Sequence, residues 1–393
     1  MPKLIFHEDK VTDINAFLKL CPFKAIDYKS GKFETNAACK MCRICVKKGP
    51  EGAVEYVEDA PKEKKDLSDW QGICVYAEQT RGGIHPVTLE LIGKARELAS
   101  VVGQKVYCIL IGYKLDAAAH ELLHYGVDEV HLYDCTRVEH FIIEPYTAIF
   151  EDFIKRIKPN AILVGATPVG RQLAPRVAAR FRTGLTADCT ILEMDQDGAL
   201  AQIRPAFGGN IMAHIHTPNN RPQMATVRYK VMDAPERNAE ESGRIILHSA
   251  DNLDLSSGIE VLSVEDKPAV KSIENADVLV VAGRGIKKKE DLSLLQSLAD
   301  RLGGELACTR PLVENGWFDP RHQIGLSGRT VRPKLIMTFG VSGAVQFTAG
   351  MNNSDMIIAV NTDQTAPIFK IAHYGVVGDL YEVIPAILEK IGK

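Results

Sequence analysis

The sequence predicts an α/β protein in three parts: a small cysteine-rich module followed by two α/β domains. Four cysteines gather between residues 21 and 45, ahead of a charged stretch. Short apolar runs alternate with amphipathic stretches from residue 73 to residue 164, and a second series, from residue 278, ends in glycine-rich or polar loops. Apolar strands separated by helices are typical of parallel sheets that are covered on both faces.

Length and charge narrow the range of functions. At 393 residues the chain exceeds what a single core usually covers. The formal net charge is -3, without the basic stripe that nucleic-acid binding requires and without a polybasic membrane patch. There is no apolar amino-terminal segment and no run of about 18 apolar residues, so neither export nor a membrane span is indicated. We therefore expect a cytoplasmic protein that binds no nucleic acid.

The first module is predicted from the spacing of its cysteines. Bacterial ferredoxins carry the run C-x2-C-x2-C-x3-C-P, and in two-cluster proteins the last cysteine of each run ligates the other cluster. Cys39, Cys42 and Cys45 form a triplet, and Cys21 followed by Pro22 supplies a fourth thiolate. The ligand positions of the other cluster are occupied by Val11, Ile14, Phe17 and Gly49. The chain therefore has all four cysteine ligands of one cluster and none of the ligands of the other. This predicts a ferredoxin-like module with a single 4Fe-4S cluster.

A four-cysteine zinc site is the alternative, although such sites more often show two separate C-x2-C pairs than a triplet beside Cys-Pro. We assign no chemistry to the other five cysteines, which sit in or beside apolar runs as ordinary buried cysteines do: Cys74, Cys108, Cys135, Cys189 and Cys308. The charged run 58–66 has no apolar face to bury and predicts a linker. The module is therefore expected to span residues 1–66.

The second domain is predicted to span residues 67–257. Strands are expected at 73–76, 106–111, 130–133 and 161–164, with helices at 87–101, 117–124 and 142–157. This alternation predicts a Rossmann-like α/β domain. Between residues 188 and 229, shorter strands around Gly208-Gly209 and a turn at 217–220 favour an antiparallel extension. The polar stretch 233–242 and the loop 251–258 then end the domain.

The third domain, residues 265–393, is expected to be a doubly wound parallel sheet. Its strands are predicted at 278–282, 305–307, 335–338 and 356–360. Ligands of such sheets bind outside the carboxyl ends of the strands. There the chain places Gly283 and Gly285, which let the backbone approach a phosphate, Arg284 and Arg310, which attract it, and a helix start after Gly343. A dinucleotide site is therefore predicted at this edge.

Two motifs in this domain carry little weight alone. Gly283-x-Gly285 is a weak signal because Lys288 stands where the dinucleotide fingerprint has its third glycine. Ser342 followed by Gly343 lacks the spacing of a nucleophile elbow, and no Asp and His follow in a convincing order. A hydrolase is therefore not expected.

Longer stretches resemble a known family. The segments 333–336, 340–346, 349–351, 359–361, 366–369 and 374–380 resemble the signature of electron transfer flavoprotein alpha subunits, as do 170–176 and 183–189. The resemblance covers about residues 68–393. An added amino-terminal ferredoxin module is similar to alpha subunits of anaerobes, which work in flavin-based electron bifurcation or its reverse, confurcation.

The resemblance implies that the third domain binds FAD. By position in the family, the FAD contacts would be Arg284, Thr309, Arg310, Ile324, Gly325, Leu326, Ser327, Ser342, Gly343, Ala344, Val345, Gln346, Phe347, Asn361, Asp379 and Leu380. Arg310 would lie beside the flavin ring and stabilise its anionic reduced form. Ser327 would offer its hydroxyl to the flavin N5. Phe347 stands where several members have histidine, which predicts an altered one-electron potential.

A structural alternative exists for some of these residues. Asn361 and Asp379 are types that favour helix caps, and Ser327 is a type that favours turns. Arg171, Arg176 and Asp188 fall in family motifs near the subunit interface, but surface ion pairs are an alternative for them as well.

The resemblance further implies an electron-carrier subunit that breaks no substrate bond. FAD would shuttle electrons between a flavin/NADH site of a beta subunit and a flavin-dependent dehydrogenase of the acyl-CoA or 2-hydroxy-acid type, while the cluster exchanges electrons with ferredoxin. Mobility near residues 251–270 would set the distances for transfer. In a second hypothesis the cysteine module only docks a partner. A stand-alone NAD-dependent dehydrogenase is a third, and it lacks a plausible acid-base pair.

Overall fold

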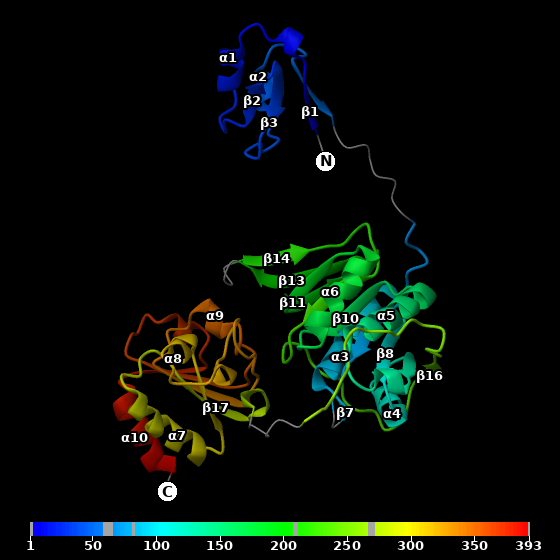
Figure 1. Ribbon diagram of the computed structural model, residues 1–393. Coiled ribbons are helices and arrows are strands. Elements are labelled where there is room, and N and C mark those ends of the chain that lie inside the picture. The colour runs from blue at the N-terminus through cyan, green and yellow to red at the C-terminus, as the bar shows by residue number, and fades with distance from the viewer. Residues whose placement is uncertain (1–2, 58–65, 81–82, 207–210, 266–271, 392–393) are drawn as a thin grey trace. The chain divides into compact units, whose positions relative to one another are not determined.

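The computed structural model describes residues 3–57, 66–80, 83–206, 211–265 and 272–391 (Figure 1). The chain forms two compact units, residues 1–66 and 67–393, and each is described by itself. The predicted linker lies outside the described residues except for Asp66, as do Gly208 and Gly209.

The first unit is a small α/β fold around a cluster of aromatic rings. Strand β1 (Lys3–Phe6) pairs antiparallel with β4 (Val54–Val57), and β2 (Ile26–Lys29) with β3 (Lys32–Thr35). Helix α1 (Ile14–Lys19) is capped by Asp13, whose carboxylate accepts the Ala16 N–H at 2.9 Å, and α2 (Ile44–Lys48) follows the cysteine triplet. Phe17 is 2% exposed, and its ring centroid lies 4.8 Å from that of Phe33.

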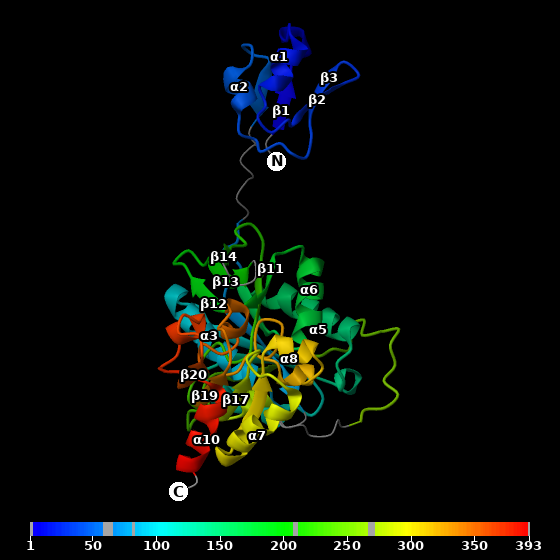
Figure 2. The same ribbon diagram turned by 90° about the vertical axis from the view of Figure 1, so that its left-hand side faces the viewer.

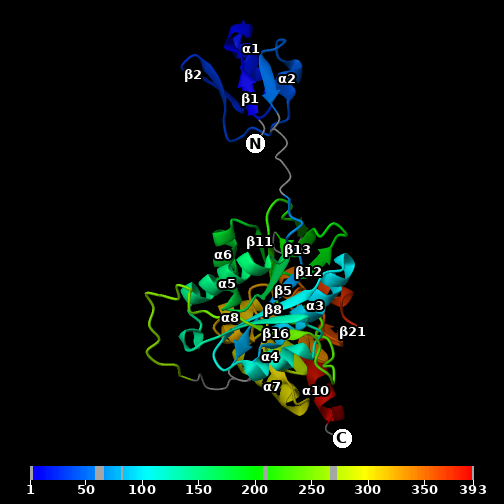
Figure 3. The same ribbon diagram turned by 90° about the vertical axis from the view of Figure 1, so that its right-hand side faces the viewer.

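The second unit contains a seven-stranded parallel sheet. Its strand order is β11 (Leu185–Cys189), β15 (Gln223–Val227), β10 (Ala161–Gly165), β5 (Ile73–Ala77), β8 (Val106–Gly112), β9 (Glu129–Asp134) and β16 (Arg244–Leu247). Helices α3 (Pro86–Val102) and α4 (Asp116–Leu123) cover one face, and α5 (Ile143–Ile157) and α6 (Gly170–Phe181) cover the other (Figure 3). The predicted α/β alternation is confirmed. Strand β16 was not predicted, because its four residues follow a long polar stretch.

Antiparallel strands are present in the stretch 188–229, as predicted, but they do not extend the seven-stranded sheet. Strands β12 (Ile191–Met194), β13 (Leu200–Ala206) and β14 (Ile211–Ile215) form an antiparallel sheet of their own. Strand β15 lies in the same predicted stretch and β11 ends in it, but both belong to the parallel sheet, so the stretch is only partly antiparallel. Strands β6 (Gln79–Thr80) and β7 (Gly83–Ile84) form a small ladder.

The same unit contains a five-stranded parallel sheet in the order β18 (Glu305–Cys308), β17 (Val278–Ala282), β19 (Leu335–Phe339), β20 (Ile357–Asn361) and β21 (Tyr374–Val377). Helices α7 (Leu292–Arg301) and α10 (Leu380–Ile391) pack on one face (Figure 2). Short α8 (Arg310–Glu314) and α9 (Val345–Thr348) follow β18 and β19. The doubly wound prediction is confirmed. Strand β21 was not predicted: it has only four residues, and all of them are exposed at the edge of the sheet.

Short 3-10 helices join these elements at Glu8–Lys10, Thr136–Val138, Ile273–Asn275, Lys289–Asp291, Pro320–His322 and Pro367–Lys370. No helix in the described ranges is both long enough and apolar enough to span a lipid bilayer.

Candidate functional site

The backbone comes close to itself at one point on the rim of the five-stranded sheet. Strand β17 lies between β18 and β19, so the chain changes direction across the sheet at the β17/β19 boundary, where doubly wound sheets bind ligands. The Gly283 N–H donates to the Phe339 carbonyl at 2.9 Å, and the Gly285 N–H donates to the Gly340 carbonyl at 3.0 Å. A Cβ on Gly283 would lie 2.3 Å from the Gly340 oxygen. Only glycine fits this crossing.

A cavity of about 780 Å³ opens beside this crossing, at the carboxyl ends of four strands. Eleven of the sixteen residues that were predicted to bind FAD line it: Arg284, Thr309, Arg310, Ile324, Leu326, Ser327, Ser342, Ala344, Gln346, Phe347 and Asn361. Loops that are far apart in the sequence therefore meet at the predicted edge of the sheet.

The other five predicted residues do not line the cavity. Gly325 and Gly343 have positive φ angles of 133° and 83° and hold the turns of two lining loops. Val345 begins α9 and is largely exposed. Asp379 accepts the Tyr381 N–H at 3.0 Å at the start of α10, as the helix-cap alternative expects, and Leu380 is buried in the core beneath α7 and α10.

The polar groups of the cavity wall suit an anionic ligand. Arg284 is exposed, and Arg310 is exposed with its Nε 2.8 Å from the Glu314 carboxylate. The Thr309 Oγ1 is buried and has no hydrogen-bond partner among the described residues. Such an unmatched hydroxyl favours a bound polar group. The predicted helix start after Gly343 is α9, which has four residues, so its dipole contributes little.

Hydrogen bonds within the wall fix the remaining side chains. Asn361 donates from Nδ2 to the Val341 carbonyl at 2.8 Å, and its Oδ1 accepts the Asp363 N–H at 2.9 Å. Ser327 accepts a hydrogen bond from Gln323 at 2.8 Å, so its hydroxyl already has a partner within the wall. Phe347 is 6% exposed and packs in the apolar core below.

Several lining residues were not among the predicted contacts, namely Gly285, Pro311, Gln323, Gly340, Val341, Asp363, Ala366 and Pro367. Four of these eight, Gly285, Gly340, Val341 and Asp363, lie in the loops that follow the predicted strands. Gln323 is different, because it precedes the predicted loop and reaches the cavity through an isolated bridge to Cys308. The sequence around Gln323 does not indicate this contact. The cavity, with a glycine crossing, two cations and an unmatched hydroxyl, fits a dinucleotide such as FAD.

The four cysteines of the first unit line one small pocket. None of the four forms a disulfide with another described residue, and the Cys21 sulfur accepts the Ala25 N–H at 3.3 Å. Burial raises the pKa of the Cys45 thiol, and the nearby Cys42 and Cys21 raise it further. In the described part of the chain, no three metal-binding side chains stand close enough together to hold a metal ion. The predicted donors share a pocket without forming a closed metal site.

The lost ligand positions have become part of the apolar core. Phe17 is buried, and Val11 and Ile14 pack against the same cluster of side chains. At Gly49 a Cβ would lie 2.4 Å from the Cys45 carbonyl oxygen and 3.2 Å from the Phe17 ring. Apolar packing therefore fills the positions that a second ligand set would need. The other five cysteines are also free, four of them buried and Cys135 partly buried.

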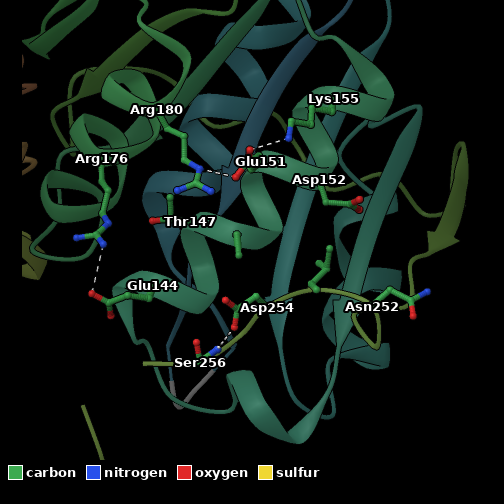
Figure 4. Close-up of a pocket in the computed structure, with 12 residues that line it drawn as sticks. Glu144, Thr147, Glu151, Asp152, Lys155, Arg176, Arg180, Asn252, Asp254 and Ser256 are labelled. Atoms are coloured by element: carbon green, nitrogen blue, oxygen red, sulfur yellow. Dashed lines mark hydrogen bonds and ion pairs between the residues drawn. The ribbon is translucent and has the colours of Figure 1, made fainter. Parts of the chain in front are cut away.

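A second pocket, of about 490 Å³, lies between α5, α6 and residues 252–256 (Figure 4). Its charged side chains face one another. Arg176 lies 3.4 Å from Glu144, while Glu151 pairs with both Lys155, at 2.6 Å, and Arg180. Arg171 similarly pairs with Asp188 at 3.0 Å. The ion-pair alternative for Arg171, Arg176 and Asp188 thus has its partners in place, and the charges of this pocket are largely matched among themselves.

Comparison with known proteins agrees with this geometry. Residues 73–253 match the electron transfer flavoprotein domain, and residues 272–352 match the electron transfer flavoprotein FAD-binding domain. The second match contains most of the cavity wall, including Arg284, Arg310 and Phe347.

Three relatives cover most of the chain. Lactate dehydrogenase (NAD(+),ferredoxin) subunit LctC of Acetobacterium woodii is 56% identical over 376 residues, which is 96% of this chain and 90% of the relative. Electron transfer flavoprotein subunit alpha of Thermoanaerobacterium thermosaccharolyticum is 43% identical, over 83% of this chain and 99% of the relative. The alpha subunit of Megasphaera elsdenii is 44% identical, over 84% of this chain and 98% of the relative. With its FAD-binding domain match and relatives of this length and identity, the chain belongs to the electron transfer flavoprotein alpha subunit family.

Proposed function

We propose that this chain is the alpha subunit of a heterodimeric electron transfer flavoprotein whose FAD occupies the cavity at the β17/β19 boundary. The observation that carries this proposal is that cavity, which lies within the segment matching the family's FAD-binding domain. In this function the chain carries electrons between a flavin/NADH site of the beta subunit and a flavin-dependent dehydrogenase.

The residues of the wall have separate roles in this proposal. Gly283 and Gly285 keep the strand ends close enough for backbone N–H groups to meet a pyrophosphate, and Arg284 neutralises its charge. Thr309 supplies its unmatched hydroxyl. Arg310 and Ser327 face the redox-active ring, where the guanidinium favours a negative charge. Phe347 closes the wall with an apolar ring. Bound FAD supplies the one- and two-electron redox chemistry.

We further propose that Cys21, Cys39, Cys42 and Cys45 bind a 4Fe-4S cluster that exchanges electrons with ferredoxin, in bifurcation or confurcation. Four thiols around one pocket are the donor set that such a cluster requires. The alignment lengths support a role that only some relatives share. The LctC alignment spans 96% of this chain and must enter the first unit, whereas the other two stop at 83% and 84%, about the share that residues 67–393 represent.

The name of the Acetobacterium relative favours one class of partner. That protein is a subunit of a lactate dehydrogenase linked to NAD(+) and ferredoxin. We therefore propose a 2-hydroxy-acid dehydrogenase as the partner of this chain, in preference to an acyl-CoA dehydrogenase.

The alternative is that the cysteine unit is a docking module that takes no part in electron transfer. Residues 1–66 form a compact unit of their own with its own core, which is compatible with either role. An electron path requires iron, whereas a docking role requires only the folded surface.

A single cysteine substitution separates these two functions. The alpha subunit is produced anaerobically with its beta subunit, as wild type, as Cys42→Ala, and as Cys135→Ala, a control in the other unit. Iron, FAD and ferredoxin-linked electron transfer are measured on each complex. The proposal expects Cys42→Ala to lose iron and ferredoxin-linked transfer while keeping FAD. Transfer that persists in an iron-free complex would support the docking module, and a wild-type chain without FAD would contradict the proposed FAD site.

A further inference from the structure

One arginine outside the FAD-binding segment reaches the wall of the cavity. Arg228 directly follows β15, at the carboxyl end of the seven-stranded sheet, and only 12% of its side chain is exposed. Its Nη2 donates to the Leu326 carbonyl at 2.9 Å. Leu326 and its neighbour Ser327 both line the cavity. The seven-stranded sheet therefore contacts the wall of the candidate FAD site through this guanidinium.

The loop that carries Leu326 is held from several sides. The Leu326 N–H donates to the Gln346 carbonyl at 2.7 Å, and the Gly325 N–H donates to the Arg329 carbonyl at 3.1 Å. These bonds tie the loop to its own domain. The Leu326 carbonyl is different, because its donor comes from a residue 98 positions earlier in the chain. Arg228 thus bonds to the carbonyl of a residue that lines the cavity.

The Arg228 guanidinium is itself held in place by a carboxylate. Asp188 Oδ2 lies 3.4 Å from Arg228 Nη2, and Asp188 Oδ1 accepts a hydrogen bond from Arg171 at 3.0 Å. The Asp188 N–H donates to Thr226 of β15 at 2.9 Å, which anchors the carboxylate to the sheet. The Asp188 carboxylate thus faces two arginines, so these three side chains together carry a net positive charge next to the cavity wall.

We propose that Arg228 is a positioning residue for the flavin: through the Leu326 carbonyl it sets the orientation of the 324–328 loop, and its charge raises the redox potential of the bound ring. This inference rests on the proposed FAD site. It predicts that a residue of the middle domain tunes a cofactor that belongs to the carboxyl-terminal domain.

The test compares Arg228→Met with Arg171→Met in the complex with the beta subunit. Both variants remove an arginine from Asp188, but only Arg228→Met removes the bond to Leu326. We expect Arg228→Met to weaken FAD binding about tenfold, since a hydrogen bond from a charged donor is lost. The flavin potential should become more negative and the visible circular dichroism of the flavin should change. Arg171→Met should stay within about twofold of wild type in FAD affinity.

A second variant covers the case in which Arg228→Met does not fold. Arg228→Lys keeps the charge and loses the planar guanidinium, so FAD affinity should fall by about threefold while the potential stays close to that of wild type. Equal affinity, potential and flavin spectrum in Arg228→Met and Arg171→Met would overturn the inference, as would wild-type affinity in Arg228→Lys. A wild-type complex without FAD would contradict the proposed function instead, so the two failures are distinguishable.

Discussion

In each parallel sheet of residues 67–393, one boundary between neighbouring strands is the place where the chain changes direction. In the seven-stranded sheet this boundary lies between β5 and β10, and in the five-stranded sheet it lies between β17 and β19. Glu78 and Thr167 follow β5 and β10, and the Thr167 hydroxyl donates to the buried Glu78 carboxylate at 2.5 Å. Gly283 and Gly340 follow β17 and β19, and a large cavity opens beside them.

The difference shows that the topology alone does not make a ligand site. Both boundaries have the geometry that doubly wound sheets use for binding. In the first, the Thr167 hydroxyl and the buried Glu78 carboxylate satisfy one another. In the second, glycines let two strand ends approach closely, and the cavity opens beside that crossing. The residues just after the strands therefore distinguish the boundary beside the candidate FAD cavity from the other one.

The largest expected effect comes from adding one carbon atom to the open boundary. Gly283→Ala places a Cβ 2.3 Å from the Gly340 oxygen, so the two strand ends must separate. We expect FAD binding to weaken by more than about a hundredfold, because several wall contacts shift together. FAD bound per chain, measured by absorbance after gel filtration, checks this.

Gly258→Ala is the matched control, because a Cβ there meets no atom within 4 Å. It should retain FAD as wild type does. Equal FAD content in the two variants would mean that the glycine crossing is not needed for the site.

The predictability of the two boundaries from sequence also differs. The open one was predicted, because Gly283, Arg284 and Gly285 directly follow an apolar strand, at the edge where doubly wound sheets bind ligands. The boundary between β5 and β10 was not predicted. Glu78 and Thr167 lie 89 residues apart, and their hydrogen bond depends on the order of the strands in the sheet. The Arg228 contact was missed for the same reason. Strands β16 and β21 were missed because each is a short edge strand whose pairing partner, rather than its own pattern, makes it a strand.

A smaller effect is expected from removing the Thr167 hydroxyl at the boundary between β5 and β10. Burial raises the pKa of Glu78 above its ordinary value of 4.5, and the Thr167 hydrogen bond partly opposes that rise. Between the ordinary pKa and the raised one, the folded chain holds a proton that the unfolded chain has lost. Stability therefore falls as the pH rises through this window.

Thr167→Val removes both that hydrogen bond and the one that Thr167 accepts from the Gly170 N–H at 3.0 Å. The pKa of Glu78 then rises further, so the loss of stability grows with pH. We expect a cost of about 1 kcal/mol at pH 5 and about 2 kcal/mol at pH 8, measured by urea unfolding, with FAD content unchanged. Thr80→Val, at an exposed hydroxyl, is the control. A cost that is equal at both pH values would show that Glu78 is not the titrating group.

The smallest effects are expected at Asp134 and Asn361, two residues that each end a strand and hold the loop after the neighbouring strand. Asp134 ends β9 and accepts the N–H groups of Lys114 and Leu115, at 2.9 and 2.8 Å, in the loop after β8. Asn361 ends β20 and donates to Val341 at 2.8 Å in the loop after β19. Each side chain fixes the loop of the neighbouring strand, but only the second loop lines the cavity.

Alanine at these two positions should therefore separate stability from binding. Asn361→Ala should weaken FAD binding about fivefold, which corresponds to about 1 kcal/mol, because the Val341 loop loses its tie while the rest of the wall remains. Asp134→Ala should lower the free energy of unfolding by a similar amount and leave FAD affinity unchanged, because the loop it holds leads into α4. FAD titration and urea unfolding of both variants provide the measurement. If Asp134→Ala weakened FAD binding as much as Asn361→Ala does, both substitutions would act on FAD binding through the overall stability of the fold. The hydrogen bond from Asn361 to the Val341 loop would then have no specific role at the candidate FAD site.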